Sequence, residues 1–384
     1  MQNARVVTRE QLLEAASVAV VDGKVTTISS NLVSADFDSV IDLDAATLFP
    51  GFVDVHIHGA VGVDTMAASK DDLQRVAQFL AANGVTAWLP TLVPAPASDY
   101  QKAVSAIDAL MQQQANEEAA SGARVLGVHY EGPFVNSSQC GALHTAHFKS
   151  FSGISDIEIL PTPRAPGAVR MMTLAPEIPG GIELIQQLVD RGWIVSIGHT
   201  RAGLEELEQA FAAGARHLTH FMNAMPPLHH RAPGPVGWGL TKHDVTFDVI
   251  ADGIHVDSLV LKLVLQAKGT DGVTLISDAI AAAGAGDGNY DIWGETISVK
   301  SGRTSNAKGS IAGSVITMLD AVKMMRSLGV LEVQIAQMAA TNPARLLGLD
   351  QLRGSIEVGK DADLVAVDEQ GAVTFTMVGG QLAS

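Results

Sequence analysis

The chain has 384 residues, of which 47% are hydrophobic and 17% are charged. This composition supplies ample apolar material for a large core and excludes an intrinsically disordered protein. The 25 basic and 41 acidic residues give a formal charge of −16, which repels polyanions and argues against a nucleic-acid partner. Any anionic substrate must therefore be held by local positive groups.

The only cysteine, Cys140, cannot form an intramolecular disulfide. The opening residues, MQNARVVTRE, lack the apolar core of a signal peptide. The most lipid-like stretch, residues 259–267, is interrupted by Lys262 and falls short of the ~20 apolar residues that span a membrane. We therefore expect a cytoplasmic protein with no membrane partner.

Both ends of the chain have the pattern of short strands. Residues 1–50 contain a turn at Asp22-Gly23, and residues 350–384 have turn glycines between alternating apolar residues, followed by a strand pair through Val378. The pattern predicts a small β-sandwich domain that residues 1–50 and 350–384 form together.

Between these ends, in residues 51–349, apolar strand-like runs alternate with helical patterns. Helices are readable at residues 71–83, 182–190 and 204–213, each ending at or near a glycine. The alternation predicts a (β/α)8 TIM-like barrel, with an open doubly wound sheet as the alternative. The expected strands are residues 52–58, 85–93, 124–131, 169–175, 193–199, 215–220, 245–251 and 272–278.

Two histidines close the first expected strand. Because side chains in a strand alternate between faces, His56 and His58 point the same way and could bind one metal ion. Taken alone, the pair is equally consistent with a polar strand face.

Glu131 ends the third strand, where a carboxylate after an apolar run would be costly to bury without a cation. The following Gly132-Pro133 fits a surface turn as well. His199, His220 and Asp278 end the fifth, sixth and eighth strands. Each alone has a plainer explanation, since buried histidines are usually structural and strand-end aspartates commonly cap helices.

The common placement of these six residues at strand ends favours a metal site over separate structural roles. In a barrel, the carboxyl ends of all strands meet at one mouth, so these six side chains are expected to converge there. Imidazoles and carboxylates suit Zn²⁺ or another divalent transition metal such as Fe²⁺. Glu131, between the His56/His58 pair and the His199/His220 pair, could bridge two ions. His217, in the sixth strand, is expected to be structural instead.

Longer motifs extend along nearly the whole chain. They are PGFVDVHIHG (50–59), EGPF (131–134), GHT (198–200), HFMNAMP (220–226), ADGIHVD (251–257), SDA (277–279), GSIAGS (309–314), NPA (342–344) and GSI (354–356). With these motifs the chain resembles the amidohydrolase superfamily and, within it, the N-acetylglucosamine-6-phosphate deacetylase family. The resemblance implies hydrolysis of N-acetyl-D-glucosamine 6-phosphate to D-glucosamine 6-phosphate and acetate.

The resemblance also implies residue roles. Glu131, His199 and His220 would hold the catalytic metal, and His56 and His58 with Glu131 a second ion. Family members that use one metal replace the His-x-His pair, so its presence favours two. Asp278, also in the implied ligand set, would act as general acid/base, taking a proton from the attacking water and returning it to the leaving amine.

For the substrate, the resemblance implies a phosphosugar ligand whose phosphate is bound by Arg231 from the neighbouring subunit, and hence a homodimer. Without the resemblance, Arg231 would be read as a solvated loop charge. The other implied contacts are Ala142, Asn223, Ala224, Asp252, His255, Ile311, Ala312 and Gly313.

One position departs from the family pattern. Some members carry histidine where this chain has Leu143, and His144 is next in sequence. One sugar or phosphate contact is therefore either lost or supplied by His144. Gly284 to Gly288 reads as an exposed loop or as a flap over the site.

Three alternatives stay open at this point. N-acetylgalactosamine-6-phosphate differs from the glucosamine compound by the orientation of one hydroxyl. Cyclic-amide hydrolases of the superfamily bridge their metals with a carboxylated lysine, and the strand at 169–175 has no lysine. A metal-free barrel used for assembly or regulation should have lost ligands that this chain retains.

Overall fold

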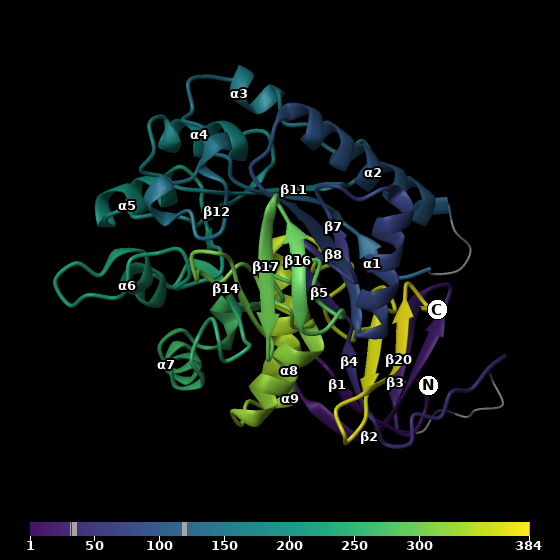
Figure 1. Ribbon diagram of the computed structural model, residues 1–384. Helices are drawn as coiled ribbons and strands as arrows, with labels where there is room; N and C mark the ends of the chain where they lie inside the picture. The colour runs from purple at the N-terminus through teal and green to yellow at the C-terminus, as the bar shows by residue number, and fades with distance from the viewer. Residues whose placement is uncertain (31, 33–36, 117–120, 384) are drawn as a thin grey trace.

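The computed structural model describes residues 1–30, 32, 37–116 and 121–383. Its centre is a nearly closed barrel of eight parallel strands, which confirms the predicted fold class (Figure 1). In spatial order the barrel strands are β5 (Phe52–Ile57), β8 (Val85–Leu92), β10 (Gly127–Glu131), β11 (Val169–Leu174), β12 (Ile194–Ile197), β13 (His217–Leu218), β14 (Thr246–Ile250) and β15 (Val273–Ile276), with the short β9 (Arg124–Val125) beside β8.

Helices surround the barrel. They are α1 (Lys70–Ala82), α2 (Ala97–Asn116), α3 (Ser155–Glu158), α4 (Gly181–Val189), α5 (Leu204–Ala212), α6 (Gly234–Thr241), α7 (Ser258–Lys268), α8 (Met318–Ser327), α9 (Glu332–Ala336) and α10 (Asn342–Leu346). Short helical turns are η2 (Ser137–Gln139), η3 (Thr145–His147), η4 (Thr270–Gly272) and the π-helical η5 (Gln337–Thr341). Within the described ranges, no helix is long and apolar enough to cross a bilayer.

Helix α1 shows how local sequence sets these elements. Ser69 caps its N-terminus, because its hydroxyl accepts from the backbone of Asp72 while the Asp72 carboxylate accepts from the backbone of Ser69. Leu73, Val76, Ala77 and Leu80 are buried at helical spacing against the barrel. The helix stops before Gly84, whose φ of +82° a residue with a side chain adopts at a cost.

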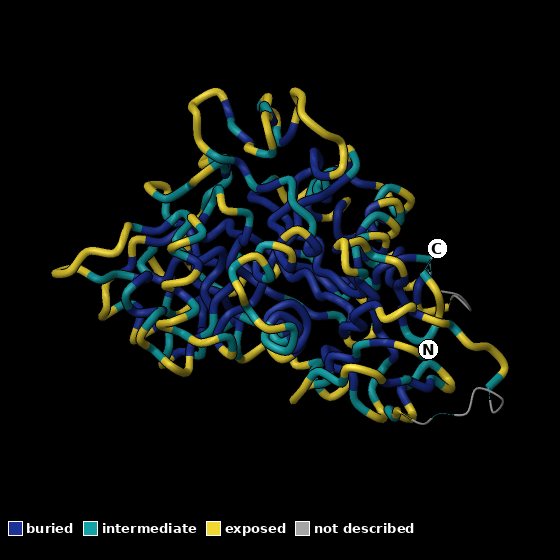
Figure 2. The backbone as a smooth tube through the Cα atoms, turned by 90° about the horizontal axis from the view of Figure 1, so that it is seen from below, coloured by how far each residue is buried: buried dark blue, intermediate teal, exposed yellow. Residues whose placement is uncertain are grey.

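The barrel strands are almost wholly buried, and in β8 every residue from Val85 to Leu92 is buried. Strands of a parallel sheet covered on both faces need such continuous apolar runs. Figure 2 shows the resulting buried centre inside an exposed rim.

The barrel seam between β15 and β5 is closed at the mouth by residues just beyond the strand hydrogen-bond ladder. The backbone of Asp278 donates to the carbonyl of His56 over 2.9 Å, and the backbone of His58 donates to that of Ala279 over 2.8 Å. Asp54, which is fully buried in β5, accepts hydrogen bonds from the hydroxyl and backbone of Ser277. Metal-ligand candidates and barrel closure therefore share the same few residues.

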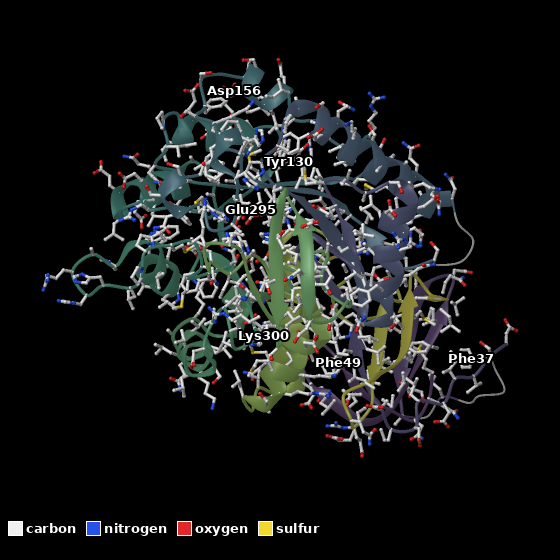
Figure 3. All side chains as sticks on the ribbon, viewed as in Figure 1. Phe37, Phe49, Tyr130, Asp156, Glu295 and Lys300 are labelled. Carbon is white, nitrogen blue, oxygen red and sulfur yellow. The ribbon has the colours of Figure 1, made fainter. Side chains whose placement is uncertain are left out.

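The two chain ends form one seven-stranded sheet, which confirms the predicted small β structure. Its order is β21 (Gln381–Leu382), β20 (Val373–Val378), β19 (Leu364–Val367), β4 (Thr47–Pro50), β1 (Ala4–Val7), β2 (Leu12–Val21) and β3 (Lys24–Ser29). Phe49 of β4 packs against Phe52 of β5 with ring centroids 6.1 Å apart, at the junction of sheet and barrel (Figure 3). The division into domains 1–50 plus 350–384 and 51–349 stays a prediction.

An antiparallel sheet in front of the barrel was not predicted. It contains β16 (Gly288–Ile292), β17 (Glu295–Lys300) and β18 (Arg303–Ser305), and a second short hairpin joins β6 (Gly59–Ala60) to β7 (Val63–Asp64). The segment 284–288 is an exposed turn that leads into β16. Most residues of β16 are exposed, so its sequence contains no apolar run that would predict a strand.

A largely buried ion-pair cluster lies in the C-terminal segment just before β19 and supplies a test of stability. The Arg353 guanidinium lies 3.2 Å from both Asp361 and Asp363, and its side chain is only 10% exposed. We expect Arg353→Ala to lower the free energy of unfolding by about 3 kcal/mol, because it leaves the carboxylate of Asp363 buried without its cation. Denaturant titration measures this.

The matched control is Arg75→Ala, which removes an exposed arginine paired with Asp72. Its effect should be below about 0.5 kcal/mol. Equal effects of the two substitutions would contradict the role given to Arg353.

Candidate metal and active site

The six side chains expected to converge do so at the carboxyl ends of the barrel strands. His56 and Glu131 are on β5 and β10, His58 directly follows β5, and the other three follow β12, β13 and β15. All six residues are buried. Two groups have ligand atoms close enough to share a metal ion: His56, His58 and Glu131, and Glu131, His199 and His220.

Glu131 lies at the centre of this cluster. Its Oε1 is 2.9 Å from the Nε2 atoms of both His199 and His220. On the other side, Oε1 is 3.6 Å from His56 Nε2 and Oε2 is 3.4 Å from His58 Nε2. The carboxylate therefore stands between the two histidine pairs, as a bridging ligand would.

Asp278 faces the first histidine pair. Its Oδ1 lies 3.4 Å from His56 Nε2 and 3.3 Å from His58 Nε2. This buried oxygen has no hydrogen-bond partner among the residues that the structure describes. It is placed to exchange a proton with a molecule bound in the cluster.

Three of these residues have left-handed backbone conformations. The φ angles are +47° at His199, +34° at His220 and +49° at Asp278. Residues with a Cβ are uncommon in this region, and each such residue costs of order 1–3 kcal/mol. The turn after each strand thus aims the side chain back over the barrel axis.

A second layer of contacts holds the ligands in place. The Asp248 carboxylate accepts a hydrogen bond from the backbone of His220. The carbonyl of Gln139 accepts from His199 Nδ1 over 2.8 Å, which leaves Nε2 facing Glu131. Burial raises the pKa of Asp54 to about 7, against the opposing effect of its hydrogen bonds from Ser277 and His56.

The remaining buried histidines nearby have other partners. His129 bonds to the carbonyl of Val55 and the hydroxyl of Thr173. His217 bonds to Thr246 through Nδ1 and to Asp248 through Nε2, which confirms the expectation that it is structural.

The charges in the cluster shift its pKa values in opposite directions. Burial alone lowers the pKa of His58, but the nearby carboxylates of Asp278 and Glu131 outweigh it and raise the pKa to about 10. In His220 burial is likewise outweighed by Glu131, and the pKa rises to about 9. Burial would raise the pKa of Glu131, yet the nearby His199 and His56 hold it well below its usual range.

The donor set fits divalent metal ions. The Nε2 atoms of His56 and His58 are 3.2 Å apart, and those of His199 and His220 are 3.1 Å apart. Two ligands each about 2.1 Å from one tetrahedral ion lie roughly 3.4 Å from each other. Two ring nitrogens that face each other at this distance repel unless a proton or a cation lies between them.

A cavity of about 130 Å³ opens above this cluster. Most of the predicted substrate contacts line it: Ala142, Asn223, Ala224, His255, Ile311 and Gly313. Sequence reasoning missed Gly141 and Trp293, which also line it. Trp293-Gly294 between alternating residues was a usable hairpin signal.

Three predicted contacts lie elsewhere. Asp252 is behind His255, whose Nδ1 it binds over 2.7 Å, and Ala312 is fully buried in a neighbouring apolar cluster. Arg231 is exposed and hydrogen-bonded to His230, away from the cavity of its own chain. At the position that differs from the family pattern, Leu143 lines this cavity, whereas His144 lines a neighbouring cavity.

Comparison with known proteins identifies the family. A model described as the amidohydrolase family matches residues 47–383. This chain belongs to the amidohydrolase family. Among relatives of this amidohydrolase, the N-acetylglucosamine-6-phosphate deacetylase of Bacillus subtilis (strain 168) is 35% identical and is aligned over 100% of this chain and 96% of that protein.

Two further amidohydrolase matches bear on the substrate. The N-acetylgalactosamine-6-phosphate deacetylase of Escherichia coli O157:H7 is 36% identical over 99% of this chain and 98% of that protein. A structure of a mutant N-acetyl-D-glucosamine-6-phosphate deacetylase from Mycobacterium smegmatis, in complex with N-acetyl-D-glucosamine-6-phosphate, has a TM-score of 0.88 and 31% identity, covering 99% of this chain and 98% of that one.

Metal binding by this amidohydrolase is expected to release protons. The raised pKa values of His58 and His220 mean that both rings hold protons at neutral pH in the metal-free site, and a ligand must lose its proton. The apparent Zn²⁺ affinity should therefore rise from pH 6 to pH 8, by about tenfold per pH unit for each proton displaced. Calorimetry in buffers of different ionisation enthalpy counts the protons; an affinity independent of pH would refute the assignment.

Proposed function

We propose that this protein removes the acetyl group from N-acetylglucosamine 6-phosphate by hydrolysis, in the cytoplasm. One observation carries the proposal: a buried carboxylate, Asp278, faces a His/Glu cluster with the donor set for two metal ions, at the floor of a small cavity. Amide hydrolysis needs this combination of a polarising site and a proton carrier.

Two divalent ions, Zn²⁺ or Fe²⁺, are proposed as cofactors. His199, His220 and Glu131 would hold one and His56, His58 and Glu131 the other. Bound there, such ions polarise the amide carbonyl and make water nucleophilic near neutral pH. The buried chain residues exclude bulk solvent, which strengthens these electrostatic effects.

Asp278 is proposed as the proton carrier. As a carboxylate it accepts a proton from the attacking water, and it then delivers this proton to the amine, because an amine anion is a poor leaving group. Its left-handed backbone and its link to β5 fix its position relative to the cluster.

The sugar is proposed to lie against the cavity wall formed by Ala142, Asn223, Ala224, His255, Ile311 and Gly313. Asp252 orients His255 through its backbone and its ring. Ala312 would act only through the backbone beneath Gly313. The side chain of Leu143 has no hydrogen-bonding group, so this contact to the sugar is proposed to be lost.

Arg231 is proposed to bind the phosphate of a substrate held by a second copy of the chain in a homodimer. Its guanidinium is exposed on the loop that precedes α6 and extends outward from the barrel (Figure 1). Guanidinium binds phosphate through paired hydrogen bonds, and local positive charge is needed on a chain whose formal charge is −16.

N-acetylgalactosamine 6-phosphate is the second candidate substrate, because a relative named for it is as similar as those named for the glucosamine compound. A cyclic-amide hydrolase is disfavoured, since β11 has no lysine and Glu131 occupies the bridging place.

The proposal predicts acetate release from N-acetylglucosamine 6-phosphate at a higher kcat/KM than from its galactosamine epimer or the unphosphorylated sugar. Asp278→Asn should reduce kcat by about a thousandfold, because it cannot carry the proton. Enzymatic acetate assay and metal analysis of the same samples measure both. Asp190→Asn, at the exposed end of α4, is the matched control and should keep the wild-type rate. No acetate from any of the three compounds with metal bound would overturn the proposal.

Arg231→Ala should raise KM for the phosphorylated substrate about tenfold or more, since a charge-assisted phosphate contact is lost. The KM for unphosphorylated N-acetylglucosamine should not change. Arg164→Ala, which removes another exposed arginine, should alter neither value. A similar rise in KM for the phosphorylated and the unphosphorylated sugar would show that Arg231 does not act on the phosphate.

A further inference from the structure

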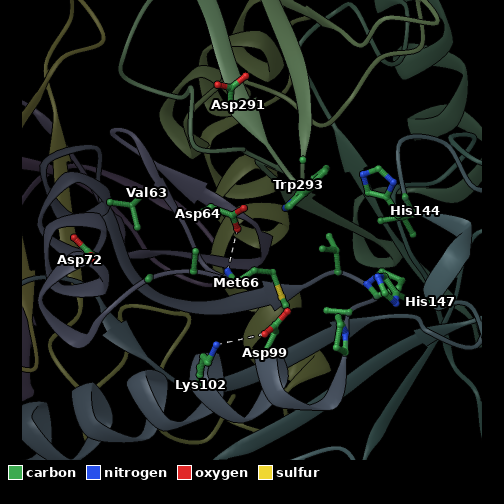
Figure 4. A pocket seen from close by; sticks show the side chains of 18 of the residues that line it. Val63, Asp64, Met66, Asp72, Asp99, Lys102, His144, His147, Asp291 and Trp293 are labelled. Carbon is green, nitrogen blue, oxygen red and sulfur yellow. Dashed lines mark hydrogen bonds and ion pairs between the residues drawn. The ribbon is translucent and has the colours of Figure 1, made fainter.

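Two cavities meet beside the metal cluster. The site cavity of about 130 Å³ adjoins a larger one of about 800 Å³, and the residues common to both linings are Leu143 and Trp293. Figure 4 shows the larger cavity, with the Trp293 indole between Asp64 and His144. These two apolar side chains therefore form a partition between the reaction site and a much larger space.

The position of Trp293 in the chain is unusual for its residue type. Trp293 and Gly294 form the two-residue turn between β16 and β17, where Ile292 pairs with Glu295, and their φ angles are +53° and +78°. Such turns favour Asn-Gly, because both central residues need positive φ. A bulky side chain there costs roughly 1–2 kcal/mol in backbone conformation.

The ring so placed touches the metal cluster. The indole of Trp293 meets the imidazole of His58 edge-to-face, with centroids 5.1 Å apart at an interplanar angle of 80°. Leu143 packs with Val93 and Val135, and Met66 and Trp293 lie against this cluster. The hairpin thus holds an aromatic wall on the His58 side of the site.

The wall faces the acyl end of the proposed substrate, so this step rests on the proposed function. The proposed sugar contacts Asn223 and His255 follow the sixth and seventh barrel strands, whereas the wall stands beside His58, which follows the first strand. The acyl and nitrogen substituents of an amide extend in opposite directions from its carbonyl. A substrate whose sugar lies against Asn223 and His255 would therefore extend its acyl group toward the part of the cavity wall that Trp293 and Leu143 form beside His58.

We propose that Trp293, together with Leu143, sets the maximum length of the acyl group that this enzyme removes. The partition leaves room for the methyl of an acetyl group and blocks a straight chain of four carbons. Opening it gives such a chain access to the larger cavity, whose nearest lining residues, Met66 and Val93, are apolar.

The test compares kcat/KM for the N-acetyl and N-butanoyl forms of glucosamine 6-phosphate, in metal-analysed wild-type and variant enzymes. The wild type should prefer the acetyl compound at least a hundredfold. Trp293→Ala should raise the butanoyl-to-acetyl ratio at least tenfold. Tyr290→Ala is the matched control, because it removes an aromatic ring from the same hairpin that lines neither cavity, and it should leave the ratio unchanged.

An unchanged ratio in Trp293→Ala, or an equal rise in Tyr290→Ala, overturns the inference while wild-type deacetylation leaves the proposed function intact. If the wild type releases no acetate, the proposed function itself has failed. Should Trp293→Ala not fold, Leu143→Ala opens the same partition from its other half and must raise the ratio as well.

Discussion

The site depends on one buried charge. Glu131 is only 3% exposed, and a carboxylate removed from water in this way needs compensating positive charge on every side. Four imidazole nitrogens supply directed contacts within 3.6 Å, two from each side of the carboxylate. This one requirement accounts for the convergence of five strand ends on the same point, and it makes the cluster suited to cations rather than to a neutral ligand.

Holding the ligands costs conformational energy that the rest of the barrel must offset. His199, His220 and Asp278 all leave their strands with positive φ, and the neighbouring Asp248 and Ser277 fix these turns through buried hydrogen bonds. Because Asp278 and His56 also join β15 to β5 through their backbones, the strained residues are locked by the closure of the barrel itself. Packing of the large core supplies the stabilising free energy.

The sequence was most informative where function and periodicity coincide. All six cluster residues end apolar strands, so barrel geometry alone predicts their meeting. His129 shows the limit of such reasoning: it lies two residues before Glu131 on the same strand face, yet hydrogen bonds to Val55 and Thr173 occupy it. Trp293 was missed because β16, the strand before it, is mostly exposed and has no apolar run. Arg231 lies on an exposed loop, and single-chain geometry gives no partner subunit for it.

The strand order of the terminal sheet has a consequence for how the protein is made. Strand β4 lies between β1, from the first residues, and β19, which begins at Leu364. Ribosomes release the chain from its amino end, so β4 lacks one of its two neighbours until β19 has been synthesised. Its exposed edge is a template for pairing with other chains during that interval. Pairing of this edge with other chains is therefore blocked only after β19 has joined β4.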